Sequence, residues 1–372
     1  MILRSLTLRN FRNYQSENFS LHEGLNLIYG ENAQGKTNLL EAIHILLTFR
    51  SFKQLKTEEL IQFGQPQARI KGEVYTELGL NDVHIVLNKG GKAVRLNGKV
   101  VYRLTKVVGK FNTVAFLPSD LELIKGSPQG RRRYLDRVIC NFNPEHLIDL
   151  RSYLRSLMQR NALLTKSARL SSDSIEVWDE RIAELGAKII ERRIKYTKKF
   201  ESEVREIYKL LTGNDSQISM HYGTSFKLTS NISGAFKERL KSSLDVDRRR
   251  GYTSVGPHRD IIEFRIDGKN ANEFASQGEA KTIAIALKVS EIEISKIKTG
   301  RTPILLLDDI TSELDERRKS FLFQLLNEFR GQIFVTATNP AEILFKGEKR
   351  LFHIKAGSAR TADSKKVGSS LN

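Results

Sequence analysis

The sequence predicts an α/β fold in which a mixed β-sheet with flanking helices is interrupted by an inserted helical hairpin. Short, mainly apolar runs at residues 25–29, 303–309 and 333–338 have the length and composition of buried strands. The first of these runs leads into a glycine-rich loop and then into a helix with an apolar stripe. From Pro144 onward, by contrast, apolar residues recur at helical spacing.

The first hundred residues predict several antiparallel strands. Residues 68–75, 83–87 and 93–96 alternate apolar and polar side chains, which is the pattern of strands with one buried face. Asn88-Lys89-Gly90-Gly91 and Asn97-Gly98 are hairpin turn signals. Because two-residue hairpins join antiparallel neighbours, these segments should form a second, antiparallel part of the sheet.

Two long helices are expected in the middle of the chain, joined by a polar break at 167–174. The first carries a seam on which apolar residues alternate steps of three and four, with Asn161 as a polar member. A polar residue on such a seam fixes the register of packing. The second helix should run from about 177 to 211. Because the link is short, the two helices should form an antiparallel hairpin.

These patterns divide the chain into four parts. Residues 1–118 form the first lobe of the sheet domain, and residues 119–214 form the helical insert. Residues 215–358 form the second lobe, because their two apolar strands belong in one sheet with the strand at 25–29. Residues 359–372 are rich in Ser, Lys and Gly and are expected to be disordered.

The composition predicts a basic cytosolic protein. The 372 residues include 61 Lys and Arg against 43 Asp and Glu, a formal net charge of +18. Such an excess attracts polyanions, of which nucleic acid is the commonest large one. A single cysteine, Cys140, excludes an intrachain disulfide framework. Neither a signal-peptide core nor an apolar run of membrane-spanning length is present, so no membrane partner is expected.

A phosphate-binding loop (P-loop) is the most specific motif, and it reads Gly30-Glu31-Asn32-Ala33-Gln34-Gly35-Lys36-Thr37. Its glycines let backbone N–H groups surround the α- and β-phosphates of a nucleotide. Lys36 supplies a charge for the β- and γ-phosphates, and the Thr37 hydroxyl can bind Mg²⁺. A guanine-specific site is not indicated, because Asn88-Lys89-Gly90-Gly91 lacks the Asp of an Asn-Lys-x-Asp string.

Two acidic residues and a capped helix extend the candidate nucleotide site. Asp308 and Asp309 end an apolar strand; in P-loop proteins the first such residue holds Mg²⁺ and the second can orient the attacking water. Ser276-Gln277-Gly278-Glu279 opens a helix predicted through Lys298, with Ser276 and Glu279 as a capping box. The backbone N–H groups at such a helix start can also receive a phosphate.

The order of these motifs resembles the ATP-binding-cassette ATPases of chromosome maintenance, and among them the bacterial recombination mediators. The matching strings are Leu8 to Tyr14, Gly30 to Ile43, Arg131 to Asp136, Val255 to Asp260, Ala275 to Glu279 and Leu306 to Asp315. They are spread over nearly the whole chain. The resemblance implies a P-loop ATPase head of the ATP-binding-cassette type, with the helical insert as an arm.

The resemblance also implies that ATP is held between two copies of the chain. Lys36 and Thr37 of one copy would face the helix of the other copy that starts at Ser276-Gln277-Gly278-Glu279. Asp308 would hold Mg²⁺ and Asp309 would position or activate water. The residues implied at the dimer seam are Ser312 and Asp315.

The function implied by the resemblance is ATP-dependent binding of DNA in recombinational repair. The DNA would be gapped, branched or double-stranded, and the homodimer would work with the partner protein RecR and help to load a recombinase. Many cassette ATPases have Glu where this chain has Asp309, and commonly His where it has Thr336-Ala337-Thr338. We therefore expect weak ATPase activity, stimulated by DNA. Gln54 is a candidate for the glutamine that senses the γ-phosphate.

Two arginine runs, Arg131-Arg132-Arg133 and Arg248-Arg249-Arg250, are the densest basic segments and are candidate DNA contacts. No zinc-finger spacing or helix-turn-helix string is present, so binding should be weakly sequence-specific and strongly salt-dependent. Two alternatives share the nucleotide motifs. The soluble ATPase subunit of a membrane transporter fits the basic charge and the long hairpin less well. A chromosome-structural ATPase should have a far longer coiled coil.

Overall fold

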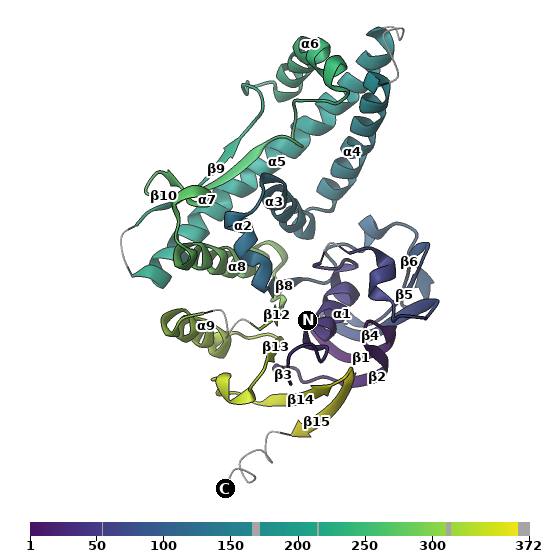
Figure 1. The fold of residues 1–372 in the computed structure, drawn as a ribbon, viewed down its shortest axis with the longest axis vertical. Coiled ribbons are helices and arrows are strands. Elements are labelled where there is room, and N and C mark those ends of the chain that lie inside the picture. The colour runs from purple at the N-terminus through teal and green to yellow at the C-terminus, as the bar shows by residue number, and fades with distance from the viewer. Residues whose placement is uncertain (54, 166–171, 214–215, 310–313, 364–372) are drawn as a thin grey trace. The chain divides into compact units, whose positions relative to one another are not determined.

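The computed structural model describes the chain except for residues 54, 166–171, 214–215, 310–313 and 364–372 (Figure 1). Residues 1–120 and 291–372 form one compact unit, and residues 121–290 form another, so the division falls within a single long helix. The segment 215–290, which the sequence patterns placed with the second lobe, thus belongs to the unit of the helical insert. The reason is that its strands pair with each other and pack on the insert.

The first unit contains a six-stranded sheet in the order β15-β14-β3-β13-β12-β8. Its strands are β3 (Leu25–Tyr29), β8 (Thr113–Phe116), β12 (Ile304–Leu307), β13 (Ile333–Ala337), β14 (Lys349–Lys355) and β15 (Ser358–Asp363). All neighbours are parallel except the hairpin of β14 and β15. The three apolar runs recognised in the sequence therefore lie side by side, as predicted.

An antiparallel sheet in the order β2-β1-β4-β5-β6-β7 completes this unit. Its strands are β1 (Ile2–Phe11), β2 (Tyr14–Ser20), β4 (Gln67–Thr76), β5 (Gly79–Asn88), β6 (Gly91–Leu96) and β7 (Lys99–Val100). The predicted turns are confirmed, since Asn88 pairs with Gly91 and Leu96 pairs with Lys99 across two-residue loops.

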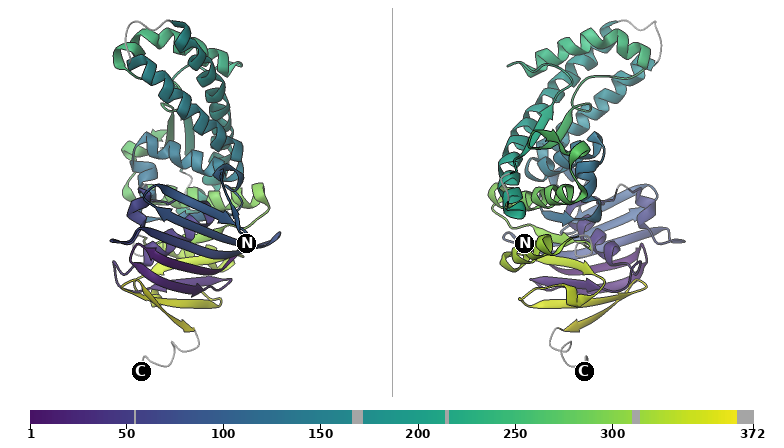
Figure 2. Two further views of the ribbon diagram at one scale, coloured as in Figure 1. Left: turned by 90° about the vertical axis from the view of Figure 1, so that its right-hand side faces the viewer. Right: turned by 60° about the vertical axis from the view of Figure 1, so that its left-hand side comes forward.

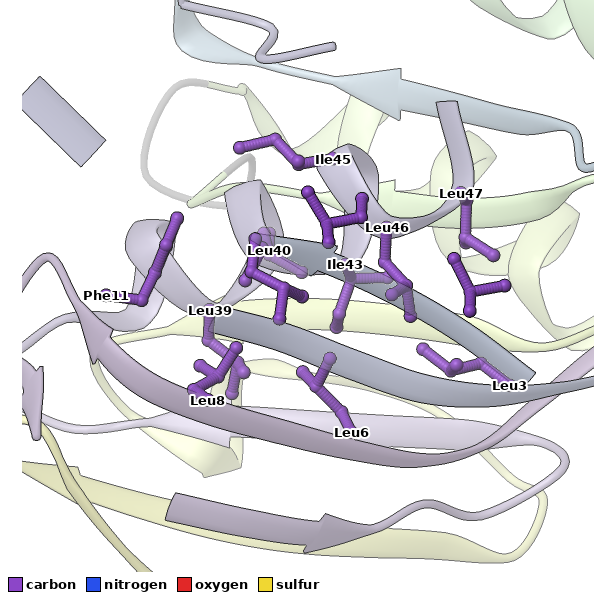
Figure 3. Packing of buried hydrophobic residues seen from close by; sticks show 14 of the residues in the cluster. Leu3, Leu6, Leu8, Phe11, Leu39, Leu40, Ile43, Ile45, Leu46 and Leu47 are labelled. Atoms are coloured by element: carbon purple, nitrogen blue, oxygen red, sulfur yellow. The ribbon is translucent and has the colours of Figure 1, made fainter. Parts of the chain in front are cut away.

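Helix α1 (Lys36–Thr48) packs against strands of both sheets and holds the core of the unit. Leu39, Leu40, Ile43 and Leu46 of α1 are almost fully buried against the apolar face of β1, as Figure 3 shows. The same cluster includes apolar residues of β4, β5, β12, β13 and β14. Burial of several such side chains, at about 1.5–3 kcal/mol each, holds the helix against the two sheets.

The remaining elements of the first unit are short. They are helix α9 (Glu316–Glu328) and the 3₁₀ turns η1 (Thr57–Leu60), η2 (Leu104–Lys106), η3 (Pro118–Leu121) and η4 (Pro340–Glu342), of which η3 reaches the unit boundary.

The chain end corrects one expectation. Residues 359–363, expected to be disordered, belong to β15 and pair with β14 across the turn Ala356–Gly357. Their polar composition does not prevent this, because an edge strand is held by backbone hydrogen bonds. Both turn residues have positive φ, 49° and 76°, the geometry of a type I′ hairpin. Residues 364–372 lie outside the described part of the chain.

The second unit is built around the predicted helical hairpin. Helices α4 (Pro144–Thr165) and α5 (Ser172–Thr212) pack along each other (Figures 1 and 2), and α5 begins about five residues earlier than its periodicity indicated. The other helices are α2 (Glu122–Lys125), α3 (Pro128–Phe142), α6 (Ile232–Arg250), α7 (Ala271–Phe274) and the start of α8 (Gln277–Thr299). The strands are β9 (Ile218–Gly223), β10 (Ile261–Ile266) and β11 (Lys269–Asn270).

Buried ion pairs join the helices of this unit. Arg160 of α4 is fully buried and donates to Asp179 of α5 at 2.5 Å and to Asp247 of α6 at 2.7 Å. Next to it, the Asn161 side chain accepts from the backbone and hydroxyl of Thr253 at 2.8 and 2.7 Å. Asn161 therefore anchors the loop after α6. Among the described residues, no helix is long and apolar enough to cross a membrane.

His258 is a structural residue of the same unit. Its Nδ1 lies 2.6 Å from the Tyr153 hydroxyl, and its Nε2 lies 3.0 Å from the Thr253 carbonyl oxygen. A neutral ring satisfies both contacts by accepting at Nδ1 and donating at Nε2. Burial is the largest cause that lowers the pKa of His258 to about 4. Both ring nitrogens are therefore used in contacts that hold the fold.

Substitution of Gly357 by Ala should destabilise the first unit. The positive φ costs about 1–2 kcal/mol for an L-residue, and a Cβ would overlap the Asn13 carbonyl oxygen, adding about 1–3 kcal/mol of overpacking. Gly98→Ala is the matched control, because Gly98 has φ +75° in an equivalent turn with open space around it. Urea denaturation should give the larger loss for Gly357→Ala; equal losses would show that the close approach does not matter.

The stability of the second unit should depend on pH through His258. A folded-state pKa of about 4 lies below the ordinary 6.5, so the stabilisation is present above pH 6.5 and lost as pH falls toward 4. The full effect is about 3 kcal/mol. Asp260, whose pKa is raised to about 6 mainly by burial, acts in the opposite direction and is present in both proteins compared. Urea denaturation at pH 4.5 and 6.5 should show a smaller pH effect for His258→Gln than for the wild type. His221→Gln, at an exposed position in β9, controls for loss of a histidine; identical pH effects in all three proteins would contradict the assignment.

Candidate functional site

The P-loop lies where β3 ends and α1 begins, at the carboxyl edge of the parallel sheet. Open α/β sheets bind ligands at this edge. Gly35 is the N-cap of α1 with φ 116°, and a Cβ there would collide with the Asn13 side chain, so the position requires glycine. Lys36 is buried, and its ammonium group donates to the carbonyl oxygens of Gly30 at 2.5 Å and Glu31 at 2.9 Å.

The acidic strand meets the P-loop through Thr37. Strand β13 lies between β3 and β12, so Asp308 leaves the sheet at the same edge as the loop. The Thr37 hydroxyl donates to Asp308 Oδ1 at 2.9 Å, joining residues that are 271 positions apart in the sequence. Burial is the largest cause that raises the pKa of Asp308, and hydrogen bonds from Thr37 and Thr336 oppose it.

Thr336 ties the two acidic residues together. Its hydroxyl donates to Asp308 Oδ1 at 2.9 Å and accepts from the Asp309 backbone N–H at 2.8 Å. Thr336 is fully buried at the end of β13. Asp309 is half-buried and adopts φ 46°, a left-handed conformation that Asp tolerates better than most residues. Thr336, the first residue of the string that stands where many cassette ATPases have His, thus contacts both acidic residues.

The arrangement fits a magnesium nucleotide. A carboxylate and a hydroxyl oxygen already in contact are the hard oxygen ligands that Mg²⁺ uses beside phosphate oxygens. Burial lowers the pKa of Lys36, while Asp309 and Asp308 raise it, so the cation sits beside both carboxylates. The loop residues Glu31, Asn32 and Ala33 are exposed, which leaves the backbone of the loop accessible to phosphate.

A brace of backbone and side-chain hydrogen bonds holds the P-loop from outside. The Gln34 carbonyl oxygen accepts from the Asn13 amide at 2.8 Å and from the Gly357 N–H at 3.0 Å. The Gln34 side chain accepts from the Ala356 N–H at 2.6 Å, and the Tyr14 hydroxyl donates to the Gly35 carbonyl oxygen at 2.9 Å. Two hairpins, β1–β2 and β14–β15, therefore fix the loop conformation.

Sequence reasoning missed Asn13, Thr336 and Lys53 as contributors to this site. Lys53 is exposed in the loop after α1, and its charge lowers the pKa of Asp308. Asn13 lies inside the string Leu8 to Tyr14 that carried the resemblance, so that string was the available signal. Nothing in the local sequence of Lys53 indicates its place.

The helix start at Ser276 is part of the second unit. The capping box is confirmed: the Ser276 N–H donates to the Glu279 carboxylate at 2.7 Å, and the Glu279 N–H donates to the Ser276 hydroxyl at 3.2 Å. These bonds lower the pKa of Glu279. Ser276 and Gln277 are exposed, and Gly278 is half-buried.

Of the residues implied at the dimer seam or as the γ-phosphate sensor, the structure describes only Asp315. Asp315 is the N-cap of α9 and accepts from the Arg318 N–H at 3.0 Å, with the Arg318 guanidinium on its other oxygen. Ser312 and Gln54 lie outside the described residues.

The two arginine runs differ in burial and in hydrogen bonding. Arg131 is buried and donates to the carbonyl oxygens of Ile262, Ile124 and Gly126, so it serves the fold of its unit. Arg132 is half-buried and donates to the Asp260 carbonyl oxygen at 2.6 Å, whereas Arg133 is exposed. The exposed residues of the second run, in the last turn of α6, are Arg248, Arg249 and Arg250.

Comparison with known proteins identifies the family. Residues 2–360 match the family described as RecF/RecN/SMC N terminal domain. The DNA replication and repair protein RecF of Citrifermentans bemidjiense is 36% identical over 363 residues, covering 96% of this chain and 99% of the relative. The RecF of Lactobacillus delbrueckii subsp. bulgaricus is 38% identical over 368 residues, covering 96% of each chain.

Solved structures agree with this match. A structure of the recombination mediator protein RecF with ATP has a TM-score of 0.91 and 34% identity, covering 97% of both chains. An Smc head bound to the C-terminal winged-helix domain of ScpA has a TM-score of 0.57 at 16% identity, which shows a shared fold. Of the alternatives that the sequence left open, this likeness favours a chromosome-maintenance ATPase over a transporter subunit. The chain therefore belongs to the RecF/RecN/SMC N-terminal domain family, with full-length likeness to its RecF members.

Proposed function

We propose that this protein is a magnesium-dependent ATPase that binds DNA as an ATP-driven homodimer in recombinational repair. The observation that carries the nucleotide part is the hydrogen bond between Thr37 and Asp308, which unites the P-loop with the acidic strand. The repair role rests on full-length likeness to proteins named for DNA replication and repair, and on a similar chain solved with ATP.

The residues of the site have separate roles in ATP hydrolysis. Backbone N–H groups of residues 30–35 and the Lys36 ammonium bind the phosphates, and Thr37 with Asp308 holds Mg²⁺. Bound there, Mg²⁺ neutralises charge that develops on the phosphate oxygens. Asp309 orients the attacking water, held in place by the contact of its backbone with Thr336. Lys36 must leave the carbonyl oxygens of Gly30 and Glu31 to reach phosphate.

A second copy of the chain completes the site in this proposal. The helix start at Ser276-Gln277-Gly278-Glu279, exposed at Ser276 and Gln277, is suited to phosphate because the positive end of the helix dipole lies there. We assign it to the ATP bound by the partner copy, with Ser312 and Asp315 at the seam. Closure then requires the γ-phosphate, so ATP favours the dimer and its hydrolysis releases it. Slow turnover suits such a switch.

The net charge of +18 supports contact with the DNA backbone. Exposed Arg248, Arg249 and Arg250 at the end of α6 are candidate contacts, as are Arg132 and Arg133. By likeness to the chains solved in the context of the RecFOR pathway, RecR is the proposed protein partner.

Substitutions at the nucleotide site should separate binding from turnover. Lys36→Ala should weaken ATP binding about tenfold or more, since a hydrogen bond to a charged group contributes about 1.5–3 kcal/mol. Asp309→Asn should retain ATP binding and lose turnover by about 10²–10⁴-fold. Fluorescent-nucleotide titration and a phosphate-release assay measure the two effects, with exposed Lys346→Ala as the control. Wild-type turnover of hundreds per second, far above a median of about ten per second, would contradict the proposed switch.

ATP should convert monomers into dimers that retain DNA. Sedimentation velocity with ATP and Mg²⁺ should show a dimer for the wild type and a monomer for Lys36→Ala. Gel retardation of gapped duplex should follow the same pattern, with retention lost in the variant. Monomers at saturating nucleotide, with DNA binding that ignores ATP, would refute the dimer switch while leaving the ATPase intact.

A further inference from the structure

One face of the antiparallel sheet in the first unit carries a concentration of positive charge outside both arginine runs. Side chains alternate between the two faces of a strand. On β1, β4 and β5, the residues of one face are buried against α1, such as Leu8, Ile70 and Ile85. The opposite face carries the residues that we call the basic sheet face: Arg9, Arg69, Lys71, His84 and Arg95. In the left view of Figure 2 these purple and blue strands lie toward the viewer.

The pairing register places these charges directly beside one another. Arg9 of β1 lies opposite Arg69 of β4. In the neighbouring row, Lys71 of β4 lies opposite His84 of β5, which lies opposite Arg95 of β6. Like charges directly opposite each other, such as Arg9 and Arg69, destabilise a sheet at roughly 0.2–1 kcal/mol per pair, whereas the lowered pKa of His84 favours its uncharged form between Lys71 and Arg95. The fold thus bears a cost that alternating charges would avoid.

The surrounding residues do little to offset this repulsion. Arg9, Arg69, Lys71 and Arg95 are exposed, and His84 is half-buried. Lys71 has an ion pair with Asp82 at 3.5 Å, whereas Arg9, Arg69 and Arg95 form no ion pair with any described residue. Burial and then the charge of Arg69 lower the pKa of His84, Asp82 raises it, and Lys71 and Arg95 lower it further, with a net lowering. The face therefore carries an excess of positive charge, with Arg9, Arg69, Lys71 and Arg95 against the carboxylates Glu73 and Asp82.

Between this cluster and Tyr75, the same face carries the carboxylates Glu73 and Asp82, which lie opposite each other. Tyr75 is 44% exposed, and the Arg4 guanidinium lies over its ring at 4.9 Å from the centroid. The Glu73 carboxylate accepts a hydrogen bond from the Ser5 hydroxyl at 3.2 Å. Arg4 is thereby a further cation at the same sheet.

The dimensions favour a polyanion over a single anion. The charged positions cover four adjacent strands, which span about 14 Å at 4.8 Å per strand. A DNA duplex presents about eight phosphates over that length. Arginines on a rigid sheet lose less conformational entropy on contact than arginines on a loop. Base-specific reading is not expected, because a flat face contacts backbone phosphates and does not enter a groove.

We propose that the basic sheet face is a contact surface for the phosphate backbone of double-stranded DNA, separate from the arginine runs. This inference rests on the proposed DNA-binding function and adds a named surface to it. Arg69 and Arg95 are the best residues to test, because neither takes part in an ion pair among the described residues and neither belongs to the nucleotide site.

The test is DNA binding by Arg69→Gln/Arg95→Gln as a function of salt. Binding to a 30-base-pair duplex is measured by fluorescence anisotropy with ATP and Mg²⁺ between about 50 and 300 mM KCl. Loss of two phosphate contacts should reduce the slope of log K against log salt by about 1.8 and weaken binding about tenfold or more at low salt. The control, Arg330→Gln/Arg360→Gln, removes the same charge from exposed residues elsewhere in the unit and should behave as wild type.

The possible outcomes distinguish failure of the basic sheet face as a DNA contact from failure of the proposed DNA-binding function. Thermal unfolding and ATP binding of the double variant should equal or exceed those of the wild type, since like-charge repulsion is removed. Arg69→Lys/Arg95→Lys keeps the charges and should restore binding, which excludes loss of fold as the cause. An unchanged slope in the Gln variant, with normal wild-type binding, overturns the surface as a DNA contact and leaves the proposed DNA-binding function intact. Wild-type protein that fails to bind duplex overturns both proposals.

Discussion

The parallel pairing of β3, β13 and β12 is the constraint on which the nucleotide site depends. Val335 of β13 lies in register with Leu27 of β3 on one side and with Leu307 of β12 on the other. The outer two strands are therefore about 10 Å apart, and α1 brings Thr37 across that gap to within 2.9 Å of Asp308. Because α1 is itself fixed by the antiparallel sheet, both sheets contribute to one hydrogen bond.

The parts of this protein that could be predicted from sequence are those set by short-range physics. The P-loop, the hairpin turns and the capping box each depend on a few consecutive residues, and glycines or cap residues mark them. That the three apolar strands share one parallel sheet could be inferred from their length and composition, but their order in it could not. The helical hairpin was recognisable from the periodicity of its apolar residues. The start of its second helix, α5, at Ser172 was not.

What could not be predicted arises from contacts between distant segments. Thr336 acquires its role because β13 lies beside β12, and Asn13 because two hairpins meet at Gln34. Arg131 has the sequence context of a basic surface, yet backbone carbonyls from β10 and the α2 region enclose it. The basic sheet face depends on register alone, because its members are separated by up to 86 positions and form no run.

The split of the parallel sheet across the chain governs the order in which the protein can form during synthesis. Strand β3 ends at Tyr29, whereas its neighbour β13 begins at Ile333. At about 5–20 residues per second, a ribosome needs roughly 15–60 seconds to make the intervening segment. Through that interval the nascent P-loop has no acidic strand beside it, and both edges of β3 stay open, because its other neighbour, β14, begins only at Lys349. Nucleotide therefore cannot guide the early stages of folding; it can stabilise only a chain whose last third has emerged.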